Sequence, residues 1–184
     1  MSINLCLLGS SNSGKTSFVN KLVKSNNLYL TPTIGVEFTT KRFYVKDKIL
    51  EWKIWDCGFS KNLDLLTSYI LKSDIFFLFL DLSVSYNRQN TLKVIETIYN
   101  LKEKPKIILL CSKADLKSKI DDVNIDFISN KFNLDYFKIS TKDDSIKYFV
   151  EKINKFILKN VPTKELKNIK IVKKREDRPC CWIF

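Results

Sequence analysis

Residues 9–16 read Gly-Ser-Ser-Asn-Ser-Gly-Lys-Thr, between an apolar run (residues 3–8) and a segment of helical character (residues 14–24). They match G-x-x-x-x-G-K-[ST] in the strand-to-helix context that this motif requires. Two glycines let the backbone wrap an anion, so that successive N–H groups point at it from the start of a helix. The chain has four glycines in all, and two of them are in this motif. The sequence therefore predicts a phosphate-binding loop (P-loop).

Strand-like and helix-like segments alternate over the first 160 residues. The strand-like runs are residues 3–8, 36–45, 49–55, 75–82, 106–111 and 136–139, and residues 46–48 form the turn of a hairpin. The helix-like runs are residues 14–24, 87–101, 122–132 and 145–158. Such alternation predicts an α/β fold of the P-loop NTPase type, with a mostly parallel six-stranded sheet and helices on both faces. We expect one domain over residues 1–160 and a basic, flexible tail over residues 161–184.

The composition excludes several classes of function. The chain has 184 residues, a net charge of +12 and no histidine, so no mechanism can use an imidazole. The apolar stretch at residues 75–80 is far shorter than the about 20 residues of a membrane-spanning helix. No secretory signal is expected at the N-terminus. The basic tail is compatible with nucleic acid, an anionic membrane or a solvated linker, and charge alone leaves these open.

Two further segments carry a family resemblance. Ser112-Lys-Ala-Asp115 resembles the N-K-x-D element of small GTPases, and Ser140-Thr-Lys142 resembles their S-A-K element. Taken alone, Ser112-Lys-Ala-Asp115 could be an ordinary loop after a strand. Its position downstream of a P-loop makes it a strong signal for the small-GTPase element. The chain thus resembles a Ras-superfamily small GTPase (a Ras-like G domain) from about residue 3 to residue 160. Residues 34–38, Ile-Gly-Val-Glu-Phe, resemble a signature of the Rab family, as does the paired-cysteine end.

The resemblance implies GTP or GDP and Mg²⁺ as ligands. In it, Asp115 would accept hydrogen bonds from guanine, and Lys15 would reach the β- and γ-phosphates. Thr16, Thr33 and Asp56 would hold the metal. The residues that it assigns to the nucleotide are Gly9, Ser11, Asn12, Ser13, Gly14, Lys15, Thr16, Ser17, Thr33, Gly58, Ser112, Lys113, Asp115, Ser140, Thr141 and Lys142.

The segment after Asp56 departs from the family pattern W-D-x-A-G-Q-E. Here it reads Cys-Gly-Phe-Ser-Lys, so Phe59 or Ser60 takes the place of the glutamine that orients the attacking water. We therefore assign no catalytic residue and expect slow intrinsic hydrolysis. Two further departures suggest looser nucleotide binding. Asn26 stands where the family has an aromatic residue that supports the guanine, although Tyr29 could take that role. Ser112 stands in place of an asparagine, so an amide that ties the base site to the P-loop is lost.

The resemblance also implies partners. Phe38, Trp55 and Tyr69 fall where Rab proteins contact effectors, although core packing explains Trp55 and Tyr69 equally well. An exchange factor and a GAP would act at the same switch regions. Cys180 and Cys181 would be prenylated and handled by prenylation machinery and a GDI-type chaperone. We expect no nucleic acid partner, and expect the cytoplasmic face of an intracellular membrane with a cytosolic pool.

Three functions remain open from sequence. The first is a Rab-like switch that regulates vesicle traffic, and the second is a pseudo-GTPase that acts as a membrane-anchored interaction module. The third, a P-loop kinase or ATPase, leaves Asp115 and the terminal cysteines unexplained.

Overall fold

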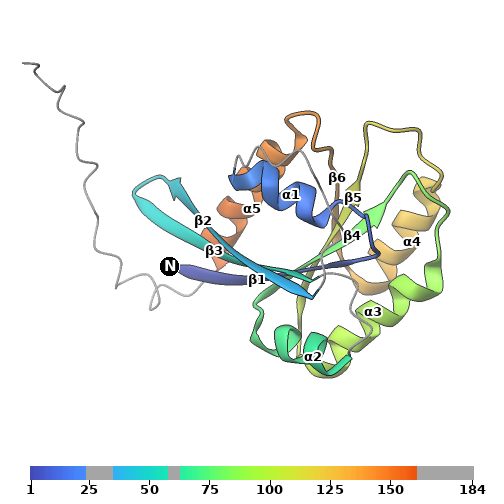
Figure 1. Ribbon diagram of the computed structural model, residues 1–184, viewed down its shortest axis with the longest axis horizontal. Helices are drawn as coiled ribbons and strands as arrows, with labels where there is room; N and C mark the ends of the chain where they lie inside the picture. Colours follow the sequence, from blue (N-terminus) through green and yellow to red (C-terminus); the bar gives the residue numbers. More distant parts are fainter. Residues whose placement is uncertain (24–34, 58–62, 161–184) are drawn as a thin grey trace, which may run out of the picture.

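The computed structural model describes residues 1–23, 35–57 and 63–160 (Figure 1). Their strands are β1 (Ser2–Gly9), β2 (Val36–Val45), β3 (Lys48–Cys57), β4 (Ile75–Asp81), β5 (Lys106–Ser112) and β6 (Asp135–Lys138). The helices are α1 (Lys15–Val23), α2 (Leu63–Lys72), α3 (Arg88–Leu101), α4 (Asp122–Phe132) and α5 (Ser145–Asn160). The expectations for Thr33, Gly58, Phe59, Ser60, Cys180 and Cys181, and for Asn26 and Tyr29, lie outside the described residues.

The six strands form one sheet in the order β2-β3-β1-β4-β5-β6. β1, β3, β4, β5 and β6 pair in parallel, whereas β2 runs antiparallel to β3 and pairs with it from Val36↔Cys57 to Val45↔Lys48. Lys46 adopts a left-handed conformation (φ 53°) in the tight turn of this hairpin. The predicted α/β class, the six-stranded and mostly parallel sheet and the hairpin are confirmed.

Helices cover both faces of the sheet, as predicted. Residues of α1 and α5, among them Phe18 and Phe149, share one core cluster with alternate strand residues. Residues of α2, α3 and α4, among them Ile70, Ile98 and Ile128, share the cluster on the opposite face. Figure 1 shows α1 and α5 above the sheet and α2 and α3 below it.

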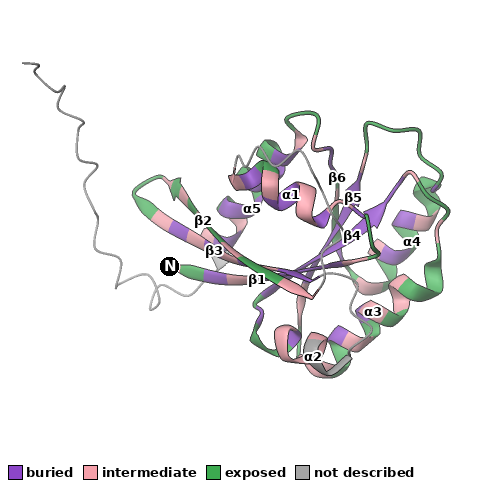
Figure 2. Cartoon of the chain, in the orientation of Figure 1, coloured by how far each residue is buried: buried purple, intermediate pink, exposed green. Residues whose placement is uncertain are grey.

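The central strand β4 is buried along its whole length (Figure 2). Its residues alternate between the two clusters, because successive side chains of a strand point to opposite faces. On one face Phe77 meets the rings of Phe18, Trp52 and Phe149, with centroids 6.1, 5.8 and 5.3 Å away. A continuous apolar run is typical of a parallel strand covered on both faces.

One helix, α2, is absent from the sequence-based expectation. The sequence does contain a helical signal here, since Leu66, Tyr69 and Ile70 recur at helical spacing. These residues pack on the core cluster of the α2–α3–α4 face, which we call the lower core cluster. Among the described residues, no helix is long and apolar enough to cross a membrane.

The chain changes sheet face between the neighbours β1 and β4. β1 leads into α1 on one face, and β4 leads toward α3 on the other. A crevice at the carboxyl ends of such strands is where open α/β sheets bind ligands. The P-loop follows β1 at this point.

Candidate functional site

The P-loop is shaped by backbone conformations that favour glycine. Gly9 (φ 142°) and Gly14 (φ 93°) lie outside the range that other residues commonly adopt, and Asn12 (φ 59°) is left-handed. A Cβ on Gly9 would stand 2.6 Å from the carbonyl oxygen of Phe79 in β4. Glycine is therefore required at position 9 for β1 and β4 to approach each other. The P-loop begins at this point of close approach.

Lys15 is folded back over the loop. It is buried, and its Nζ donates to the carbonyl oxygens of Gly9 (3.0 Å) and Ser10 (2.8 Å). Burial lowers the pKa of the Lys15 ammonium, although the Asp56 carboxylate opposes this shift. An ammonium enclosed by the loop is placed to neutralise phosphate oxygens that the same loop binds.

Asp56, at the end of β3, lies beside the first turn of α1. Thr16 Oγ1 donates to Asp56 Oδ2 at 2.5 Å. The other carboxylate oxygen, Oδ1, is buried and has no hydrogen-bond partner among the described residues. Burial raises the pKa of Asp56, and the hydrogen bond from Thr16 and the charge of Lys15 act against this.

An orphaned carboxylate oxygen next to a hydroxyl fits Mg²⁺, which prefers oxygen ligands and takes few from protein. The described residues contain no cluster of three or more His, Cys, Asp or Glu side chains, so a protein-only metal cage is not formed by them. Thr16 and Asp56 would hold the ion, and a bound phosphate would complete its shell.

The segments that the sequence assigns to the base line a cavity of about 200 Å³ beside the P-loop. Its wall includes Gly14 and Ser17 on one side, and Lys113, Asp115 and Thr141 on the other. The structure thus brings the P-loop together with two segments that lie about a hundred residues or more further along the chain. Ser11 and Asn12 are exposed at the tip of the loop, and Ser13 is fully buried.

Asp115 is held from two directions. Ser140 Oγ donates to its Oδ1 (2.6 Å), and Lys142 Nζ lies 3.0 Å from its Oδ2. The hydrogen bond from Ser140, and next that from Lys142, lower the pKa of Asp115. The carboxylate is therefore ionised at neutral pH and oriented to accept hydrogen bonds at the cavity.

One expectation about Ser112 is wrong. The sequence suggested that serine in place of asparagine frees the base site from the P-loop. In the structure Ser112 is buried, and its Oγ donates to the carbonyl oxygen of Ser13 at 2.6 Å. The hydroxyl keeps the tie because β5 lies close enough to the P-loop for a short side chain to span the gap.

Sequence reasoning missed Asp81, at the end of β4. Its Oδ2 lies 2.6 Å from Lys113 Nζ, and its Oδ1 accepts hydrogen bonds from the backbone N–H and hydroxyl of Ser83. Burial raises the pKa of Asp81, but Lys113 and Ser83 more than compensate, and the net shift is downward. An acidic residue that ends a buried strand beside the P-loop strand was the available signal.

The three aromatic residues expected at an effector surface form one stack. Ring centroids are 4.4 Å apart for Phe38 and Trp55, and 5.0 Å apart for Trp55 and Tyr69. Trp55 and Tyr69 are half-buried against the lower core cluster, while Phe38 is 50% exposed. Core packing and an exposed aromatic surface therefore coexist here.

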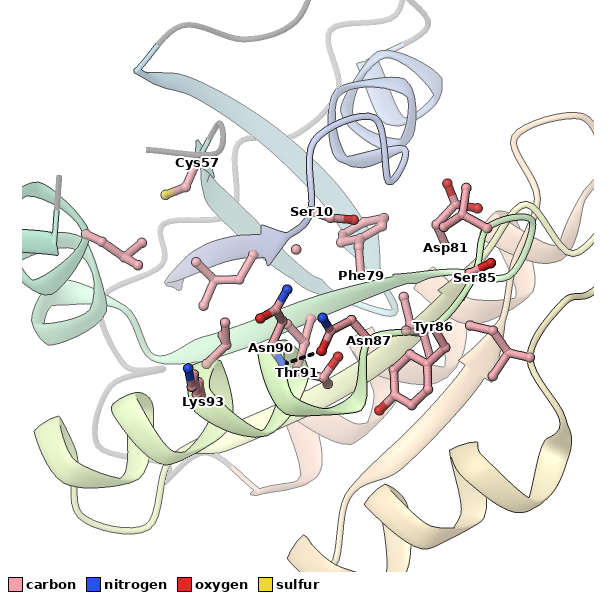
Figure 3. A pocket seen from close by; sticks show the side chains of 18 residues that line it. Ser10, Cys57, Phe79, Asp81, Ser85, Tyr86, Asn87, Asn90, Thr91 and Lys93 are labelled. Carbon is pink, nitrogen blue, oxygen red and sulfur yellow. Dashed lines mark hydrogen bonds between the residues drawn. The ribbon is translucent and has the colours of Figure 1, made fainter. Parts of the chain in front are cut away.

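A second cavity, of about 610 Å³, lies between the sheet and α3. Figure 3 shows Ser10 and Phe79 on its sheet side, Asn90 and Lys93 on α3, and Cys57 across from them. Cys57 also lies 3.5 Å from Cys6, sulfur to sulfur, and both are buried free thiols. Cys111 is a third buried free thiol.

The Ser112–Ser13 tie has a consequence for stability. Ser112→Ala leaves the Ser13 carbonyl buried without this donor, so we expect the free energy of unfolding to fall by about 1–3 kcal/mol. Denaturant titration followed by far-UV circular dichroism measures this. Ser85→Ala, at an exposed serine, is the control and should change it by about 0.5 kcal/mol or less. Equal losses in the two variants would contradict the role given to the tie.

Comparison with known proteins agrees with this geometry. The family model described as the Ras family matches residues 4–162. A Ras-related protein, RABG3c of Arabidopsis thaliana, is 29% identical over 184 residues, which cover 89% of this chain and 86% of that protein. The matched region contains every element of the sheet, the P-loop, Asp56 and both base-binding segments. This chain therefore belongs to the Ras family and is a Rab-like small GTPase.

Proposed function

We propose that the protein is a guanine-nucleotide switch that regulates vesicle traffic from the cytoplasmic face of an intracellular membrane, with slow intrinsic hydrolysis of GTP. The observation that supports this most is the placement of Asp115. Its ionised carboxylate stands at a cavity whose opposite wall is the P-loop. Phosphate and base would thus bind at adjoining parts of one crevice.

The chain's own residues would perform distinct tasks. Lys15 and the N–H groups of the P-loop bind the β- and γ-phosphates, while Asp115 selects guanine. Thr16 and Asp56 hold Mg²⁺, which neutralises charge on the phosphates. In the family a glutamine orients the attacking water, and its position falls at Phe59 or Ser60 in this chain. Phenylalanine cannot hydrogen-bond to water, and serine is too short to reach it in the same way.

Output would come from partner binding rather than from product. The stack of Phe38, Trp55 and Tyr69 presents aromatic surface next to the metal-holding Asp56. Aromatic side chains are common anchors at protein interfaces. Effectors, an exchange factor and a GAP would bind there, and a GAP could supply the missing catalytic group.

The same stack also favours a second candidate, a pseudo-GTPase that acts as an interaction module. The ring contacts of the stack join β2, β3 and α2, and they leave Phe38 half-exposed for a partner to bind whether or not a nucleotide turns over. This candidate needs no hydrolysis, so the two differ in whether the bound nucleotide ever turns over.

Base recognition is testable at Asp115. In Asp115→Asn an amide N–H₂ would face the guanine N2 amino group, whereas the C2 carbonyl of xanthine would accept from it. We expect affinity for GDP to fall about a thousandfold and affinity for XDP to rise, because a site built for one hydrogen-bond pattern rejects another strongly. Competition against a fluorescent nucleotide measures both.

The matched control is Asp121→Asn, at an exposed residue whose side chain makes no capping hydrogen bond to α4. It should leave both affinities unchanged. Unaltered GDP affinity in Asp115→Asn, or an adenine nucleotide that competes as well as GDP, would overturn guanine recognition by Asp115.

We propose that lipid on Cys180 and Cys181 anchors the protein. Two chains give stable attachment where one gives marginal binding. Cys180→Ser combined with Cys181→Ser should move the protein from salt-washed membranes to the soluble fraction of a cell lysate, and each single variant should give an intermediate distribution. A double variant that stays on salt-washed membranes refutes the anchor.

A further inference from the structure

The edge of the sheet opposite the nucleotide crevice is rich in lysine. Seven basic and three acidic residues lie in residues 161–184, so the larger part of the +12 net charge falls in residues 1–160. At the amino ends of the parallel strands the described chain places a set that we call the basic edge. Its members are Lys46, Lys48, Lys72, Lys102, Lys104, Lys106, Lys155 and Lys159.

Contacts place these lysines along one side of the domain. The Met1 ammonium donates to the carbonyl oxygen of Ile49 (3.1 Å), which joins the start of β1 to the hairpin. Phe43 of the hairpin and Phe156 near the end of α5 pack on the same core cluster. Lys106, at the start of β5, lies 4.4 Å from the ring centre of Phe156. Figure 1 shows the N-terminus, the hairpin tip and the end of α5 on one side of the molecule.

The α2–α3 side continues the same edge. Lys102, just after α3, donates to the carbonyl oxygen of Leu71 in the last turn of α2 and to that of Ser73, between α2 and β4. These contacts bring Lys72, Lys102 and Lys104 beside the amino end of β4, the strand next to β5.

Acidic residues do not balance the basic edge. Apart from Glu51, which pairs with Arg42 (2.8 Å), the acids along it are Asp47, Asp74, Glu103 and Asp135. Asp135 pairs with Lys106 (3.7 Å), and Asp74 accepts from the backbone and side chain of Asn4. Lysine thus exceeds acid about twofold. The hairpin also carries Tyr44, 77% exposed.

We propose that the basic edge is a docking surface for an anionic phospholipid bilayer. All eight cations are lysines from several separate elements, whereas bidentate recognition of single phosphates favours arginine. Such a distributed charge suits the diffuse negative potential of a leaflet, which acts within a Debye length of about 8–10 Å. An exposed tyrosine suits the headgroup level of a membrane.

The path of the chain supports the same partner. α5 ends on this edge at Asn160, and twenty residues lead from there to Cys180. This inference rests on the proposed membrane attachment for its setting. It adds that the domain itself contacts the bilayer, with the crevice and the Phe38 stack turned away from it.

The test uses the full-length chain with Cys180→Ser and Cys181→Ser, which carries no lipid, so its result does not depend on the anchor or on GTP hydrolysis. Co-sedimentation is measured with phosphatidylcholine vesicles containing or lacking 30% phosphatidylserine, at about 0.1 M salt. Lys48→Gln, Lys155→Gln and Lys159→Gln are then added to this background. All three positions are exposed. We expect the partition coefficient of this triple variant on phosphatidylserine vesicles to be at least about tenfold lower than that of its parent, since each lysine near an anionic surface contributes to binding.

The control carries the same loss of charge at Lys93→Gln, Lys117→Gln and Lys119→Gln, which are exposed and lie toward the crevice side. It should bind like its parent, and both triple variants should retain the far-UV spectrum and nucleotide of the parent. Equal binding of the two triple variants, or binding that ignores phosphatidylserine, overturns the proposal. The proposal is also overturned if single-stranded RNA displaces the parent protein from vesicles and if binding of that RNA requires the same three lysines.

Discussion

The close pairing of β1 with β4 is the constraint on which the site depends. Gly9 faces Phe79 in the strand register, and the missing side chain of Gly9 leaves room for the Phe79 carbonyl oxygen. This approach sets the P-loop beside the end of β4. Because β5 is the next strand, it also brings Ser112 to within hydrogen-bonding distance of Ser13. Any larger residue at position 9 would separate the strands whose ends form the crevice.

Side chains from different strand ends then hold the crevice together. Thr16 bonds to Asp56 of β3, Lys113 pairs with Asp81 of β4, and Ser140 bonds to Asp115. Buried polar networks are costly when incomplete and rigid when satisfied. The described network is satisfied at these pairs and leaves one carboxylate oxygen of Asp56 without a partner, where the family's chemistry places a cation. We propose that this arrangement accommodates an anion and a metal together.

Much of the fold follows from patterns in the sequence. The P-loop, the β–α alternation and the hairpin were predictable because glycine spacing and hydrophobic periodicity are local signals. α2 was missed because it directly follows residues 58–62, where the sequence departs from the family pattern. Its own apolar spacing is nevertheless helical.

The pairwise contacts of the site were not predictable to the same degree. That Ser112 replaces the function of an asparagine depends on the distance between β5 and the P-loop, which no local pattern encodes. The same holds for the Asp81–Lys113 pair and for the contact of Cys6 with Cys57. The basic edge was hidden because its lysines are scattered in sequence and gather only when the parallel strands align their amino ends.

We propose that the crevice binds guanine nucleotide and that the altered segment after Asp56 slows the hydrolysis of GTP. The most direct test is to denature the purified protein and identify the released nucleotide by ion-exchange chromatography. The account predicts guanine nucleotide in stoichiometric amount with GTP preserved. Release of GDP alone would contradict slow hydrolysis, and an empty crevice or an adenine nucleotide would contradict the binding site itself.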